Sequence, residues 1–119
     1  DLFTAINRLL EHRISGAPVV DGHGHMVGMI SEGDCLRSIL SGAYYDSIGG
    51  TVADYMTTKV ESISPETDII EVSQIFLQGR RGRMPVVEDG RLVGQISRHD
   101  VLRAVKEFAQ HDPGRRADA

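Results

Sequence analysis

Apolar residues recur along this chain with two different spacings, and each spacing predicts one kind of element. Spacings of three and four residues, typical of one face of a helix, occur within 2–10, 36–40, 69–76 and 101–105. Between the helices of each pair, a run that begins Pro-Val-Val is followed by a turn rich in Gly and Asp and by a second apolar run, which indicates a hairpin. The chain therefore predicts a β-hairpin between two helices, and it predicts this unit twice.

The two predicted units are copies of one sequence. Residues 17–37 read APVVDGHGHMVGMISEGDCLR, and residues 84–103 read MPVVEDGRLVGQISRHDVLR. Pro-Val-Val, Val-Gly, Ile-Ser, Asp and Leu-Arg recur in the same order, with an extra residue in the first turn. The period of about 66 residues is longer than those of the common solenoid repeats. Two copies of a small domain are expected instead.

The stretch between the copies, 41–60, contains several Gly and Ser residues and predicts a loop with a short helical turn at 51–56. Residues 60–65 alternate between apolar and polar and predict an extra strand that leads into the second copy. Since no such strand precedes the first copy, we expect the first strand of repeat one to be absent from the sequence. On this basis the chain divides into repeat 1 (1–42), a linker (43–55), repeat 2 (56–110) and a flexible tail (111–119).

Composition and charge narrow the function. The 119 residues include 13 Lys and Arg against 17 Asp and Glu, for a net charge of −4, which disfavours a global electrostatic grip on nucleic acid. The chain is too short for a (β/α)₈ barrel or a two-domain dinucleotide-dependent enzyme. The single cysteine, Cys35, excludes an internal disulfide. No apolar run reaches the length of a membrane span, and a cytoplasmic protein is expected.

The motifs together resemble a known family. Met56-Thr57 ahead of a strand, Pro-Val-Val on the next strand, and Gly-x-Ile-Ser-x-x-Asp at the last helix are similar to the CBS domain, and two in tandem resemble the Bateman module. The resemblance implies an α+β fold of tandem CBS domains (β-α-β-β-α repeats) packed with pseudo-twofold symmetry. It also implies a regulatory role and an adenosine-containing ligand (AMP, ADP, ATP, S-adenosylmethionine or NADH) in the cleft between the repeats. Such a nucleotide would be a regulatory ligand and not a required cofactor.

The motif Ser-x-x-Asp occurs twice, as Ser31 with Asp34 and as Ser97 with Asp100. A carboxylate can accept hydrogen bonds from both hydroxyls of a ribose, and a hydroxyl beside free N–H groups at a helix start suits phosphate. The same spacing is that of a capping box, which only stabilises the helix. Both roles stay open, and one residue can serve both.

A basic loop distinguishes the second copy. Arg80-Arg81-Gly82-Arg83 precedes its Pro-Val-Val strand, whereas the first copy has Arg13-Ile14-Ser15-Gly16. The resemblance implies phosphate contacts for Arg83 and Arg81, and a solvated loop is the alternative. Carried over by resemblance, one cleft would use Ser97, Asp100, Arg83, Arg81 and Ile96 with Ser15 and Ala5, and the other would use Ser31, Asp34 and Ile30 with Thr67, Val72 and Gly82.

Other side chains are weaker candidates for a ligand, metal or catalytic site. His99 lies inside the second motif and would meet a phosphate or base, or lie on the helix surface. His23 and His25 share a turn without a third ligand, so no metal site is expected. Cys35 lacks a partner pattern for nucleophilic catalysis. No P-loop, His-Glu-x-x-His or Gly-x-Ser-x-Gly occurs, and no catalytic residues are expected.

The resemblance therefore implies a regulatory module that binds an adenosine-containing ligand. Apolar helix faces left over after the repeats pair predict a homodimer. One alternative is a dimerisation module without a ligand, or a regulatory fragment of a larger enzyme or transporter. A nucleic-acid-binding protein that uses the arginine loop is the least favoured, because no basic–aromatic stripe accompanies the loop.

Overall fold

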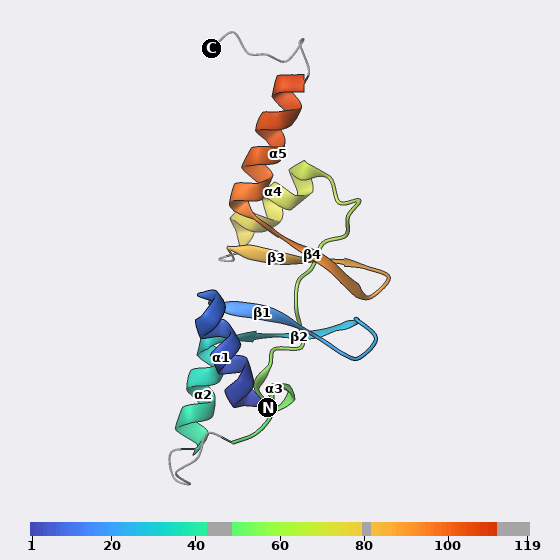
Figure 1. Cartoon of the computed structure of the whole chain (residues 1–119). Helices are drawn as coiled ribbons and strands as arrows, with labels where there is room; N and C mark the ends of the chain where they lie inside the picture. Colours follow the sequence, from blue (N-terminus) through green and yellow to red (C-terminus); the bar gives the residue numbers. More distant parts are fainter. Residues whose placement is uncertain (43–48, 80–81, 112–119) are drawn as a thin grey trace. The chain divides into compact units, whose positions relative to one another are not determined.

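The computed structural model describes residues 1–42, 49–79 and 82–111 (Figure 1). The chain divides into two compact units, Asp1–Val60 and Glu61–Ala119. Each contains an antiparallel pair of strands between two helices, as predicted. The predicted tail beyond residue 111 lies outside the described residues. The elements are α1 (Leu2–His12), β1 (Gly16–Val20), β2 (Met26–Ser31), α2 (Glu32–Gly42) and α3 (Val52–Tyr55), then α4 (Ile69–Gln78), β3 (Arg83–Glu88), β4 (Arg91–Ser97) and α5 (Arg98–His111).

The first helix of each unit begins at an aspartate. The Asp1 carboxylate accepts a hydrogen bond from the N–H of Thr4 at 2.7 Å, and the Asp68 carboxylate accepts one from Glu71 at 2.9 Å. Such a cap satisfies an amide in the first turn that has no partner within the helix. The two helices therefore start at equivalent residues of the repeat. For this reason the hairpins that follow them lie at equivalent positions in the two units.

The two hairpins share an irregularity. Both are antiparallel, and the register shifts after Val19 in the first and after Val86 in the second. The second hairpin closes on Asp89 and Gly90, whose φ angles are 52° and 80°. A tight two-residue hairpin turn needs this left-handed pair, and Gly and Asp adopt it at low cost. The two copies thus share the position of the register shift as well as the sequence pattern.

The extra strand predicted over 60–65 is wrong in extent. Ile63 alone bridges Val86, in parallel; its N–H donates to Pro85 at 3.1 Å and its carbonyl accepts from Val87 at 2.7 Å. A turn follows directly and ends the pairing after this one residue. The alternation of apolar and polar residues therefore indicated the extended backbone but not its length.

In the first unit a different segment lies against the sheet. Thr57 and Met29 each donate an N–H to the other's carbonyl at 2.9 Å. Gly28 makes room for this contact, since a Cβ there would lie 2.8 Å from Met56 Sδ and from the Thr57 carbonyl oxygen. Among the residues that the structure describes, none lies within 4 Å of such a Cβ on the equivalent Gly94 in β4. One glycine of the repeat is thus crowded and its copy is open.

Each unit has its own hydrophobic core. The first core consists of Leu2, Leu9, Ile30 and Cys35, and the second consists of Ile63, Val72, Phe76, Met84 and Val101. Two polar side chains of α2, those of Asp34 and Ser38, are also buried. The Ser38 hydroxyl donates to the Cys35 carbonyl at 2.5 Å.

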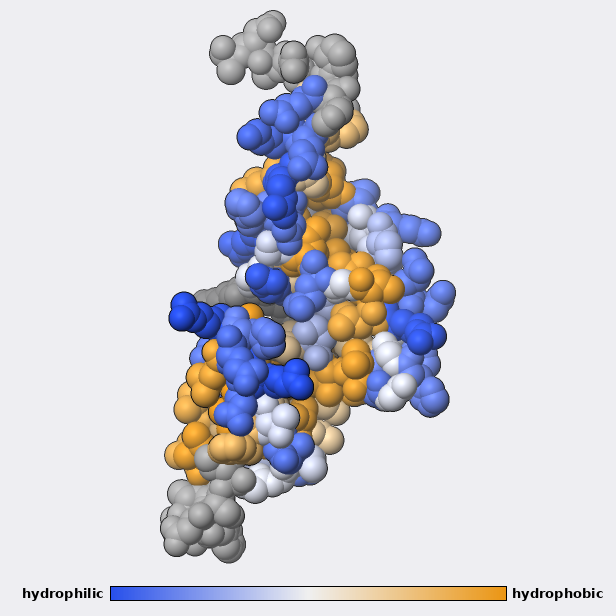
Figure 2. Space-filling model, viewed as in Figure 1, coloured by the Kyte–Doolittle hydropathy of each residue, from blue (hydrophilic) through white to orange (hydrophobic). Residues whose placement is uncertain are grey.

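Large apolar side chains remain exposed on the outer faces of the helices. On α2 and α5 they occupy equivalent positions of the two repeats, Leu36 with Leu102 and Ile39 with Val105. Some of this surface is orange along the left edge of the first unit in Figure 2. Of the helices described, none combines the length and hydropathy needed to cross a membrane.

Candidate functional site

The second Ser-x-x-Asp motif lies where β4 meets α5. The Ser97 N–H donates to Asp100 Oδ2 at 2.8 Å, and the Asp100 N–H donates to Ser97 Oγ at 3.1 Å. These reciprocal bonds form the capping box that the spacing predicts as one of its two roles. Arg103, one turn further along α5, donates to Asp100 Oδ1. The carboxylate is thus held in a fixed orientation.

Asp100 is charged and accessible. Its side chain is 36% exposed, and Arg83 pairs with Ser97 in the β3–β4 register, which brings a guanidinium into its neighbourhood. The backbone N–H of Ser97 does most to hold the pKa of the Asp100 carboxyl below its ordinary value; the Ser97 hydroxyl, Arg103 and Arg83 add to this, and desolvation opposes it. An anionic acceptor therefore lies close to an exposed cation.

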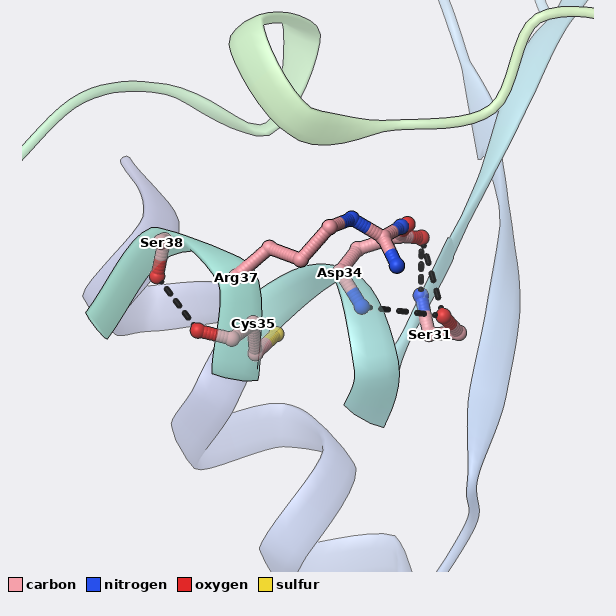
Figure 3. Close-up of polar contacts among 5 residues, drawn as sticks. All are labelled: Ser31, Asp34, Cys35, Arg37 and Ser38. Carbon is pink, nitrogen blue, oxygen red and sulfur yellow. Dashed lines mark hydrogen bonds and ion pairs between the residues drawn. The ribbon is translucent and has the colours of Figure 1, made fainter. Parts of the chain in front are cut away.

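The first motif forms the same bonds. Asp34 Oδ2 accepts the N–H of Ser31 at 2.8 Å and its hydroxyl at 3.0 Å, and Arg37 donates to Asp34 Oδ1 (Figure 3). The Asp34 N–H donates back to Ser31 Oγ at 3.2 Å. Locally, the two copies of the motif are alike.

The surroundings of the two motifs differ. The Asp34 side chain is 2% exposed, against 36% for Asp100. Gly16 pairs with Ser31 in the β1–β2 register, so the strand position that carries Arg83 in the second unit carries no side chain in the first. The accessible carboxylate with a cation from the neighbouring strand is therefore a property of the second repeat.

A third motif of the same kind starts α3, and the sequence analysis did not single it out. The N–H and hydroxyl of Thr51 donate to Asp54 Oδ2 at 2.9 and 3.1 Å. This copy caps a helix of four residues. The spacing by itself is thus a helix-starting device, and any binding role depends on what surrounds it.

The apolar residues predicted for the site lie in or beside the cores. Ile30 and Val72 are each 4% exposed and belong to the core of their own unit. Val72, Thr67 and Ile96 together line a cavity of about 180 Å³ within the second unit. The Thr67 hydroxyl accepts the N–H of Ser64 at 3.0 Å. Residues that the sequence assigned to two different clefts therefore share one cavity.

The remaining predicted residues are polar or small and lie at the surface. Ser15 is exposed, and its carbonyl accepts the N–H of Glu32 at 2.8 Å. Ala5 is half-buried on α1, and His99 is exposed in the first turn of α5. Arg81 lies outside the described residues.

Sequence reasoning missed the arginines that hold the motif. Arg37 and Arg103 follow their aspartates by three residues and pair with them; the recurring Asp-x-x-Arg, a known helix pairing, was the available signal. Arg98 donates to the carbonyls of Phe76 at 2.7 Å and Gly79 at 3.3 Å. It therefore ties the start of α5 to the end of α4.

The other reactive side chains are dispersed. Over the described ranges, no three or more His, Cys, Asp or Glu residues are placed to hold a metal ion. Cys35 is buried, and its desolvation, followed by the charges of Asp34 and Glu32, raises the pKa of its thiol. A raised pKa disfavours the reactive thiolate.

Comparison with known proteins identifies the repeat. The sequence model of the CBS domain matches residues 1–41 and 52–107. The A-adding tRNA nucleotidyltransferase of Aquifex aeolicus is 34% identical over 103 residues, which span 87% of this chain and 12% of that enzyme. The chain thus spans a small part of this relative.

Solved structures agree with the fold. The crystal structure of CBSX2 in complex with AMP, a protein of Arabidopsis thaliana, has a TM-score of 0.73 at 30% identity and covers 88% of this chain and 81% of that one. The CBS domain pair of MJ0100, in complex with 5′-methylthioadenosine and S-adenosylmethionine, has a TM-score of 0.65 at 26% identity and covers 89% and 82%. The predicted tandem CBS fold is confirmed.

Proposed function

The chain belongs to the CBS-domain family, and we propose that it is a regulatory module that binds an adenosine-containing ligand through its second repeat. The observation that carries the proposal is the partly exposed Asp100 carboxylate, fixed by Ser97 and flanked by Arg83. The structures of relatives with AMP or with S-adenosylmethionine support the class of ligand.

Each side chain has a chemical role in this proposal. The Asp100 carboxylate accepts the two hydroxyls of the ribose, as charge-assisted hydrogen bonds that orient the sugar. The planar guanidinium of Arg83 suits two phosphate oxygens at once. The Ser97 hydroxyl and the N–H groups at the start of α5 add donors for an anion. A phosphate-bearing ligand such as AMP therefore fits better than cationic S-adenosylmethionine.

The proposed activity is regulation and not catalysis. A ligand that binds one arrangement of the protein more tightly shifts the population toward it, and the shift is limited by the difference in affinity. At a ligand concentration of 100 times the dissociation constant, the bound state gains about 2.7 kcal/mol of stability. Binding is therefore measurable as a rise in melting temperature.

Calorimetric titration and thermal-shift measurements with AMP, ADP, ATP, S-adenosylmethionine and NADH test the proposal. At least one should stabilise the protein, and Asp100→Asn should weaken its binding by about 10-fold or more, because a charged hydrogen-bond acceptor is lost. Asp54→Asn is the matched control, since it alters a capping box of the same geometry with no proposed ligand role. An unchanged melting temperature with every ligand at millimolar concentration would contradict the proposal.

The choice between phosphorylated and neutral ligands depends on Arg83. Arg83→Gly introduces the residue that the first repeat carries at the paired strand position. It should reduce the affinity for AMP and leave that for adenosine nearly unchanged, because only the phosphate loses its partner. An equal loss for both would exclude a phosphate role for Arg83.

A second candidate function is self-association. Exposed apolar side chains at matched positions of α2 and α5, among them Leu36 and Leu102, favour a homodimer. Sedimentation velocity should give a dimer, and Leu102→Glu should give a monomer with an unchanged melting temperature at low concentration. A wild-type protein that stays monomeric over about a 100-fold range of concentrations would refute self-association.

A further inference from the structure

We infer that Arg98 is a positioning residue of the proposed site: it ties the end of α4 to the start of α5 and thereby prepares Arg83 for the phosphate of the ligand. The inference rests on the proposed function and adds a residue that acts on the ligand through another side chain. It starts from a guanidinium that belongs to one helix and caps a second.

Arg98 supplies hydrogen bonds that the end of α4 lacks. The last carbonyls of a helix have no partner within that helix. Arg98 Nη2 donates to the carbonyl of Phe76, in the last turn of α4, at 2.7 Å, and to the carbonyl of Gly79, just beyond the helix, at 3.3 Å. The helix dipole also favours a cation at this end. Arg98 therefore caps α4 from the first turn of α5, which packs against it (Figure 1).

The same tie fixes one end of the connection that leads to Arg83. Gly79 and Arg83 are four residues apart in the sequence. Arg83 pairs with Ser97 in the β3–β4 register, and Gly79 is held by Arg98, the next residue after Ser97. Both ends of the connection are thus anchored at the junction of β4 and α5. A segment held at both ends loses less conformational entropy when one of its side chains binds a phosphate.

The first unit completes the equivalent helix end in another way. The carbonyl of Leu9, which corresponds to Phe76 in the repeat, accepts the backbone N–H of Ile14 at 3.1 Å. The residue that corresponds to Arg98 is Glu32, whose ionised side chain has no hydrogen to donate to a carbonyl. The tie made by a side chain therefore belongs to the unit that also carries an arginine at the start of its first strand.

Titration of the whole chain with AMP and with adenosine tests the inference. Arg98→Met keeps an unbranched side chain and removes its donors, and it should weaken AMP binding by about 5-fold or more. Adenosine binding should stay within about twofold of wild type, because the ribose contacts do not use Arg83. Arg91→Met is the matched control, since it removes an exposed arginine at the opposite end of β4; its AMP affinity should stay within about twofold of wild type.

A merely structural role gives a different result. If Arg98 served only to stabilise α4, Arg98→Met would melt at a lower temperature while the folded variant bound AMP and adenosine as wild type does. That result, or an equal loss of affinity for the two ligands, would overturn the inference and leave the proposed function standing. A wild type that bound none of the adenosine ligands would refute the proposed function itself, and the inference with it.

A double-mutant cycle shows whether Arg98 acts through Arg83. Arg83→Gly, Arg98→Met and the double variant are each titrated with AMP. Because the tie serves the phosphate contact of Arg83, Arg98→Met should change the AMP affinity by less than about twofold when Arg83→Gly is already present. Losses that simply multiply in the double variant would overturn the inference, since they would show that the two arginines act independently.

Discussion

Two equivalent glycines offer a matched test of the packing within each unit. Gly28 in β2 and Gly94 in β4 occupy the same place in the repeated sequence. A Cβ on Gly28 would lie 2.8 Å from both Met56 Sδ and the Thr57 carbonyl oxygen, and none of the described residues lies within 4 Å of one on Gly94. The same substitution, Gly→Ala, should therefore have opposite effects at the two positions.

The magnitude follows from the atoms that must move. Sulfur at the end of the Met56 side chain can shift, but the Thr57 carbonyl is backbone and accepts the Met29 N–H at 2.9 Å. Overpacking of this kind costs about 1–3 kcal/mol. An alanine that fits the local backbone conformation without strain instead raises the free energy of unfolding by about 0.4–1 kcal/mol, because it lowers the conformational entropy of the unfolded chain. Gly28→Ala and Gly94→Ala should therefore differ in stability by about 1.4–4 kcal/mol.

Urea unfolding at equilibrium, with melting curves beside it, measures this difference. For a unit of about 60 residues, 1 kcal/mol corresponds to a shift of about 4–8 °C in melting temperature. Amide hydrogen exchange at Met29 and Thr57 should quicken in Gly28→Ala, since their two mutual hydrogen bonds carry the strain. Equal stabilities of the two variants, with unchanged exchange at Thr57, would refute the packing described for the first unit.

Two further predictions concern titrating groups. The pKa of the Asp100 carboxyl is lowered in the folded protein, chiefly by the Ser97 N–H. The stabilising effect of the ionised carboxylate is therefore complete above the ordinary aspartate pKa of about 4 and is lost as the pH falls through the lower folded value. The free energy of unfolding, measured as the pH is lowered, should fall more steeply for wild type than for Asp100→Asn, and parallel curves would contradict this. Burial, with Asp34 and Glu32, raises the pKa of the Cys35 thiol, so a disulfide reagent at pH 8 should modify folded protein far more slowly than protein in urea, and equal rates would show that the thiol is exposed.

The internal repeat made much of the fold predictable. Each copy carries its own helix periodicity, its own hairpin turn and its own Pro-Val-Val strand, so the two helices and the hairpin of the repeat are each indicated twice by local signals. Residues close together in the sequence determine these elements. In the second hairpin, for example, Asp89 and Gly90 adopt the left-handed angles of a tight turn. Ile63 is the contrary case. Its single bridge depends on where β3 lies, and the alternation of residues around it carries no such information.

The local geometry of the two motifs was predictable from the sequence, and their accessibility was not. The spacing of Ser97 and Asp100 indicated their hydrogen bonds, because a capping box depends on residues three apart in one helix. Asp34 is buried instead on a helix that contacts α3, a segment about 18 residues further along the chain. No local pattern reports such a contact, and the sequence distinguished the two motifs only by the basic loop that precedes the second.

In the proposed site, the hydrogen bonds that cap α5 would also favour ligand binding at Asp100. A free aspartate on a helix surface would lose side-chain entropy when it oriented toward a sugar, and that loss would weaken the ligand's affinity. At Asp100 the bonds to Ser97 and Arg103 have already fixed the carboxylate, and the lowered pKa keeps it charged at neutral pH. The proposed ligand would therefore meet an acceptor that is already ordered before binding. Asp34 is ordered in the same way, by Ser31 and Arg37, but its side chain is buried.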